Sequence, residues 1–184
     1  MIAKEKLNIL WSLEQTAEKY ADRVAVSDVN QELTWKELVK KAQVIGAELS
    51  EKVQPGNPVP VLLEKSSETL AVMLGIVYAG CFYVPVNPMN PTERLRKIME
   101  KLDPEVIISD EKGKEQLAAI GNGLENKVMG PEALKTATGT ELSEEQYSRL
   151  EQIQGQWKET DVLYGIFTSG SVSYTHLRAH ETPE

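Results

Sequence analysis

Segments with a helical spacing of apolar residues alternate with short apolar runs along most of this chain. Leu10, Leu13, Ala17 and Tyr20 form the first helical stripe, and Val24–Ser27 is the first short run. Apolar residues three or four positions apart indicate an amphipathic helix, whereas short continuous runs indicate buried strands. Strands separated by helices pair in parallel, with helices on both faces of the sheet. The pattern therefore predicts an α/β fold with a mostly parallel sheet, whose strands are residues 24–27, 59–63, 82–86, 106–109, 127–129 and 162–167.

Capping residues indicate where the predicted helices begin. Thr34 and Glu37 have the spacing of a capping box, in which the hydroxyl accepts an early helix N–H and the carboxylate reaches back. The helix after them has an apolar face made of Leu38, Ala42, Ile45 and Leu49. We expect further helices at 111–120 and 143–153.

Two more helix starts are predicted in the middle of the chain. Ser66 or Ser67 is expected to cap a helix that ends near Gly80, and Asn90 to cap another with Pro91 at its first helical position. The first of these helices has its apolar positions at Leu70, Met73, Leu74 and Val77.

Charge and hydropathy exclude several functions. The formal net charge of −8 would repel nucleic acids and anionic membranes. Residues 69–86 carry no charge, but Gly75 and Gly80 interrupt them and a buried helix followed by a strand explains them, so we assign no membrane span. Cys81 is the single cysteine, which rules out an internal disulfide and favours a reducing, cytoplasmic location.

The apolar run at 162–167 leads directly into Thr168, Ser169, Gly170 and Ser171. Residues 130–160 before it are polar, and we interpret them as a surface excursion with one exposed helix. A strand that feeds a short loop of Ser, Thr and Gly can hold phosphate, because hydroxyls and successive backbone N–H groups converge there. The same residues are also common in ordinary turns, so the four residues leave both interpretations open.

Three ordered segments together resemble the adenylate-forming superfamily, which includes acyl-CoA synthetases, luciferases and the adenylation domains of peptide synthetases. They are Leu-Thr-Trp-Lys-Glu-Leu at 33–38, Val-Tyr-Ala-Gly-Cys-Phe-Tyr-Val-Pro-Val-Asn-Pro at 77–88 and Tyr-Gly-Ile-Phe-Thr-Ser-Gly-Ser at 164–171. The last is similar to the start of that family's phosphate loop. The stretch from Asn90 to Arg94 is similar to the branch that activates amino acids, including D-alanine:carrier-protein ligases.

The resemblance implies a fold, an activity and a site. Residues 1–171 would be the N-terminal part of an AMP-binding domain, an incomplete N-terminal subdomain of the adenylate-forming fold. The parent enzyme would use ATP and Mg2+ to activate an amino acid or another carboxylic acid as its adenylate. It would then transfer the acyl group to the thiol of a carrier-protein phosphopantetheine or of coenzyme A. Thr168, Ser169, Gly170 and Ser171 would bind the ATP phosphates; no catalytic residue and no metal ligand is assigned.

The chain departs from the family pattern after Ser171. Residues 172–184 resemble the translation of a sequencing-library adapter, and we expect a non-native, disordered tail there. His176 and His180 have the spacing of two metal ligands on a helix, but no further Cys, His or carboxylate cluster completes such a site. Because the loop lysine and later motifs are missing, we expect this chain to be inactive on its own.

Two functions of other classes stay open at this stage. The chain could be a non-catalytic nucleotide-binding or interaction domain that uses a Rossmann-like sheet as a scaffold. It could also be a small hydrolase or kinase, although it lacks the GxxxxGK[ST] loop and has no histidine before residue 176 to act as a base.

Overall fold

The computed structural model describes residues 9–130, 141–158 and 160–168 of the 184-residue chain, so the predicted tail at 172–184 lies outside the described residues. The centre of the molecule is a four-stranded sheet in the order β4-β3-β5-β6, in which every neighbouring pair is parallel. The strands are β3 (Pro58–Leu62), β4 (Phe82–Pro85), β5 (Ile107–Ser109) and β6 (Val128–Met129). The predicted parallel α/β architecture is therefore confirmed for this sheet.

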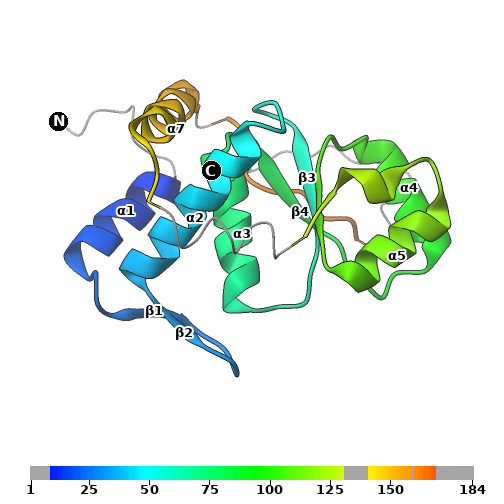
Figure 1. Cartoon of the computed structure of the whole chain (residues 1–184), viewed down its shortest axis with the longest axis horizontal. Helices are drawn as coiled ribbons and strands as arrows, with labels where there is room; N and C mark the ends of the chain where they lie inside the picture. Colours follow the sequence, from blue (N-terminus) through cyan, green and yellow to red (C-terminus); the bar gives the residue numbers. More distant parts are fainter. Residues whose placement is uncertain (1–8, 131–140, 159, 169–184) are drawn as a thin grey trace, which may run out of the picture.

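Helices cover both faces of the sheet, as Figure 1 shows for the strands β3 and β4. The helices α2 (Trp35–Ser50) and α3 (Ser67–Tyr78) lie on one side, and α4 (Thr92–Leu102) and α5 (Glu111–Ile120) lie on the other. A short 3-10 helix, η2 (Leu124–Lys127), leads into β6.

Side chains of the strands alternate between two hydrophobic cores, because successive residues of a strand point to opposite faces. Val59, Val61 and Ile108 belong to the core beneath α2 and α3. Leu62 and Ile107 belong to the core beneath α4 and α5. The central strands are thus buried on both sides, which explains why they are continuous apolar runs in the sequence.

The first predicted strand does not join this sheet. After α1 (Ile9–Lys19), β1 (Val24–Ser27) pairs antiparallel with β2 (Glu32–Thr34) in a separate hairpin. The expectation of parallel pairing is wrong here because only a short loop joins the two strands, and a parallel pair needs a long crossover. The Asp28 Oδ1 atom stabilises the turn by accepting the N–H groups of Asn30 at 2.7 Å and Gln31 at 3.0 Å.

Two of the three predicted helix starts are confirmed. Thr34 Oγ1 accepts the Glu37 N–H at 3.3 Å while Glu37 Oε2 accepts the Thr34 N–H at 2.8 Å, so the capping box forms. Ser66 caps α3 by accepting the Thr69 N–H at 3.1 Å. All four residues predicted for the apolar face of α2 are buried.

The predicted cap of α4 is wrong by one residue. Pro91 is the N-cap, and its carbonyl accepts the N–H groups of Arg94 at 2.9 Å and Leu95 at 3.0 Å. The reason is local, because the Asn90 N–H donates to the Asn87 carbonyl at 3.0 Å in a tight turn before the helix. Thr92 is consequently the first helical residue.

The predicted apolar stripe of α3 is only partly correct. Leu74 and Val77 are buried, but Leu70 is 37% exposed, and Ala71 and Ile76 are fully buried instead. A single stripe is a poor description of α3, because the helix packs against both α2 and the sheet.

Within the polar stretch at 130–160 the structure describes one helix, α7 (Glu144–Gln156), and residues 131–140 lie outside the described residues. Ser143 and Gln146 form its capping box. Most of the helix is exposed as expected, but Leu150 is 3% exposed and anchors it to the core under α2 and α3. Among the described helices, none has the length and apolar character needed to cross a membrane.

Candidate functional site

The chain that leads to the predicted phosphate loop runs beside β4, but it is not a regular strand. One parallel bridge joins Tyr164 to Tyr83, and the Gly165 N–H donates to the Tyr83 carbonyl at 3.0 Å. The prediction of a strand over 162–167 is therefore wrong in extent. Among the described residues, no strand pairs with the outer side of this segment, so its backbone lacks the second partner that a regular strand in a sheet would have. The side chains of Tyr164 and Ile166 are accordingly 47% and 52% exposed.

Side-chain contacts hold the segment in place on either side of that bridge. The rings of Tyr83 and Tyr164 stack with their centroids 5.9 Å apart. Leu163 packs against the core under α2 and α3, and Phe167 packs against the core under α4 and α5. Burial, more than the neighbouring Tyr164, raises the pKa of the Tyr83 phenol.

The direction of this segment brings Thr168 to the carboxyl edge of the sheet. Because the bridge to β4 is parallel, residues after Tyr164 run the same way as residues after Tyr83. In open parallel sheets, ligands bind outside the carboxyl ends of the strands. Thr168 is exposed there, whereas Ser169, Gly170 and Ser171 lie outside the described residues. Phosphate binding by the four residues therefore stays a prediction.

Arg94 contacts the start of this loop, a role that the sequence analysis did not assign to it although Arg94 ends the stretch that resembles the amino-acid-activating branch. Its Nη2 atom donates to the carbonyl of Phe167 at 3.4 Å and to that of Thr168 at 3.1 Å. A signal was present in the sequence, because Arg94 falls in the first turn of α4. The positive end of the helix dipole disfavours a cation at that position unless another group attracts it.

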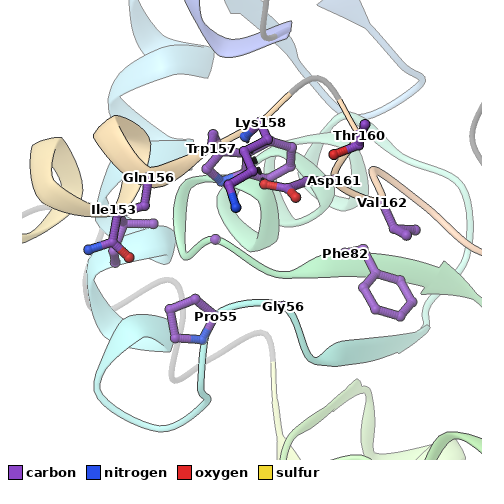
Figure 2. Close-up of a pocket in the computed structure, with 11 residues that line it drawn as sticks. Pro55, Gly56, Phe82, Ile153, Gln156, Trp157, Lys158, Thr160, Asp161 and Val162 are labelled. Carbon is purple, nitrogen blue, oxygen red and sulfur yellow. Dashed lines mark hydrogen bonds between the residues drawn. The ribbon is translucent and has the colours of Figure 1, made fainter.

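A separate cavity of about 380 Å³ lies at the opposite, amino edge of the sheet. Figure 2 shows its walls, which include Pro55 before β3, Phe82 at the start of β4, and Trp157 after α7. The Lys158 N–H donates to Asp161 Oδ2 at 2.8 Å in the turn above it.

The amino-edge cavity is the weaker candidate for phosphate. The helices α3 and α7 both end beside it, at Tyr78 and Gln156, and C-terminal helix ends carry partial negative charge that repels anions. Cys81 lies close by, and burial raises the pKa of its thiol to about 12, so it is not a nucleophile at neutral pH. Across the described ranges, no group of three His, Cys, Asp or Glu residues could hold a metal ion.

Sequence comparisons match most of the chain to one family. The sequence model of the family described as AMP-binding enzyme matches residues 13–173. Bacitracin synthase 1 of Bacillus licheniformis is 33% identical over 159 residues, which make up 86% of this chain and 3% of that protein. Tyrocidine synthase 1 of Brevibacillus parabrevis is 30% identical over 159 residues, or 86% of this chain and 14% of that protein. The chain therefore spans only a small part of the length of these relatives.

Solved structures share the arrangement of elements. A fatty acyl CoA synthetase of Mycobacterium tuberculosis aligns with a TM-score of 0.74 at 19% identity, covering 89% of this chain and 33% of that chain. The nonribosomal peptide synthetase FmoA3, solved in an AMPPNP-bound form, aligns with a TM-score of 0.62 at 26% identity. The FmoA3 alignment covers 73% of this chain and 14% of that chain.

Proposed function

The chain belongs to the AMP-binding enzyme family, and on that premise we propose that it is part of an ATP-dependent ligase that activates a carboxylic acid as its adenylate. Its fold is that of the N-terminal subdomain of adenylate-forming enzymes, as the sequence predicted. The proposal extends to a longer protein, because the chain corresponds to 3% of bacitracin synthase 1 and 14% of FmoA3. An ATP-consuming enzyme of this kind would work in the cytoplasm.

One observation carries the proposal, namely the position of Thr168 at the carboxyl edge of a parallel sheet. The bridge between Tyr83 and Tyr164 sets this direction, and the family match includes the loop that begins there. Backbone N–H groups and hydroxyls at such an edge donate hydrogen bonds to anions, and a glycine lets the backbone approach them closely. The residue types at 168–171 therefore fit the phosphates of a nucleotide.

In the proposed reaction, the residues at 168–171 would position the ATP phosphates and stabilise their negative charge. Mg2+-bound ATP supplies the adenylyl group: a carboxylate oxygen bonds to the α-phosphorus, and the bond to the departing pyrophosphate breaks. Thr168, Ser169, Gly170 and Ser171 would hold the outer phosphates by donating hydrogen bonds as negative charge develops on them. Holding them in line with the attacking oxygen lowers the entropic part of the barrier.

We propose an amino acid as the substrate and a carrier-protein phosphopantetheine as the thiol acceptor. The solved relatives support this choice, because FmoA3 is a peptide synthetase and is also the more similar of the two structures by sequence. Coenzyme A is the alternative acceptor. The fatty acyl CoA synthetase carries no weight for it, because at 19% identity the likeness shows the fold alone.

Exchange of radiolabelled pyrophosphate into ATP tests the proposed function in the longer protein that carries this chain. We expect exchange that depends on one or a few amino acids and stops when Mg2+ is chelated. Thr168→Ala should lower the exchange about tenfold, the effect of losing one hydrogen bond to a charged group. Thr160 is an exposed threonine at the start of the described range 160–168, and Thr160→Ala should leave the exchange rate unchanged.

The 184-residue chain should show no exchange, because it lacks the later motifs that the family resemblance implies. The proposed function is wrong if none of the amino acids and none of a set of fatty and aromatic acids supports exchange by the longer protein.

A further inference from the structure

Arg94 joins two parts of the molecule that are far apart in the sequence. It stands in the first turn of α4, and its Nη2 atom donates to two successive backbone carbonyls, those of Phe167 and Thr168, at 3.4 Å and 3.1 Å. These bonds hold the last two described residues, of which Thr168 is the first residue of the predicted phosphate loop. Upstream of them, the only backbone pairing of the described segment with the sheet is the bridge at Tyr164 and Gly165.

Stabilisation of α4 does not explain this side chain. The neighbouring Glu93 forms its ion pairs with Arg96 and Lys97 rather than with Arg94. Over residues 9–130, 141–158 and 160–168, Arg94 has no carboxylate partner, and its buried Nε atom has no hydrogen-bond partner. A partly desolvated cation costs free energy unless another group compensates it, and the carbonyls at 167 and 168 are the groups it reaches.

The bond to the Phe167 carbonyl sets the orientation of the peptide that joins Phe167 to Thr168. A peptide unit is planar and trans, so its N–H points opposite to its carbonyl. Holding the Phe167 carbonyl against α4 therefore turns the Thr168 N–H to the other side of the chain. Fixing these dihedral angles before a ligand arrives lowers the entropy that binding would otherwise lose.

We propose that Arg94 is a positioning residue, which clamps the Phe167 and Thr168 carbonyls and so fixes the peptide that presents the Thr168 N–H to the phosphates of ATP. That ATP is the ligand rests on the proposed function. The contact of Arg94 with the two carbonyls does not depend on that function. Arginine suits it because the guanidinium is planar, always charged and presents several donors in a fixed geometry, whereas lysine is a point charge on a flexible stem.

A first experiment measures the clamp in the 184-residue chain without any ligand. In Arg94→Ala we expect the Gly165 amide to exchange its hydrogen about tenfold faster than in the unmodified chain, read by NMR, because the segment loses two charge-assisted bonds. Arg96→Ala is the matched control, since Arg96 lies on the same helix and forms its ion pairs with Glu93 and Glu100. Equal exchange in Arg94→Ala and Arg96→Ala would overturn the clamp.

A second experiment measures the consequence for ATP in the longer protein. In pyrophosphate exchange, Arg94→Ala should raise the KM for ATP about tenfold and leave the KM for the amino acid within a factor of about two, because only the phosphate loop is disturbed. Arg96→Ala should change neither. A purely structural role would instead lower activity without separating the two KM values, and that result would overturn the positioning role.

Arg94→Lys keeps the test decisive if Arg94→Ala does not fold. Lysine keeps the charge, but its flexible stem does not hold a donor in the fixed position that the planar guanidinium gives Nη2 between the two carbonyls, so the KM for ATP should stay raised. If lysine restores the KM, charge alone is sufficient and the clamp is wrong. If the unmodified longer protein shows no exchange with any acid, the proposed function fails, while the amide exchange of Gly165 still decides whether Arg94 holds the segment.

Discussion

Asp28 ties the hairpin loop to the start of α3 through its carboxylate. The Oδ2 atom accepts the Ser67 N–H at 2.8 Å and the Ser67 hydroxyl at 2.7 Å, while Oδ1 accepts two amides of its own turn. These bonds favour the charged form, the bond from the Ser67 hydroxyl most of all, and they hold the pKa of Asp28 well below its usual range.

This lowered pKa predicts how stability depends on pH. A carboxylate whose pKa is lower in the folded state stabilises the fold above its unfolded pKa, near 3.9, and loses that contribution as the pH falls through the folded value. Asp28→Asn should lower the urea midpoint by a constant amount above about pH 5, and the difference from the unmodified chain should shrink below about pH 4. A difference that is the same at pH 3 and pH 7 would contradict this account.

At the scale of elements, α2 and α3 are in contact through two glycines. A Cβ atom placed on Gly46 would lie 2.4 Å from Tyr78 Cβ and 3.0 Å from the Gly75 carbonyl oxygen. One placed on Gly75 would lie 2.4 Å from Ile45 Cγ2. The close approach of the two helices therefore depends on hydrogen atoms at these positions.

Gly46→Ala should destabilise the chain by about 1–3 kcal/mol, because overpacking forces the helices apart and outweighs the better helix propensity of alanine. Gly155→Ala is a matched control with the opposite sign. Gly155 is also helical, but nothing lies within 4 Å of its added Cβ, so alanine should stabilise α7 by about 0.5–1 kcal/mol. Urea unfolding of both variants measures the difference. Equal effects would show that backbone propensity, and not contact between the helices, decides both.

The elements that the sequence predicts well are those fixed by local chemistry. The capping box at Thr34 and Glu37 and the helix at 111–120 formed where the pattern placed them. The turns that connect the helices and strands were not predicted. The turn from Asp28 to Gln31 converts a predicted parallel strand into a hairpin, and the turn before Pro91 moves a helix cap.

Long-range contacts limit the prediction of the site in a different way. The motif at 168–171 follows from residue types alone, and so does its place after an apolar run. The contact of Arg94 with Phe167 and Thr168 joins residues 73 and 74 positions apart, so no local pattern contains it. The same holds for the run at 162–167, whose strand character depends on neighbours on both sides.

At the scale of the whole molecule, the two edges of the sheet differ in character. The helices α3, α4 and α5 each follow a strand of the sheet, so their N-terminal ends lie at its carboxyl edge. The partial positive charge of these helix ends attracts anions. The amino edge receives helix C-terminal ends and holds the cavity lined by Trp157 and Phe82. The parallel order of the four strands therefore favours the carboxyl edge for the proposed phosphate site, independently of any single residue.

A crystal structure of the longer protein with the ATP analogue AMPPNP and Mg2+ tests this assignment most directly. We predict that the β- and γ-phosphates lie within hydrogen-bond distance of residues 168–171, with Arg94 still donating to the carbonyls of Phe167 and Thr168. Phosphates bound at the amino-edge cavity beside Trp157, or at any place away from residues 168–171, would contradict the account.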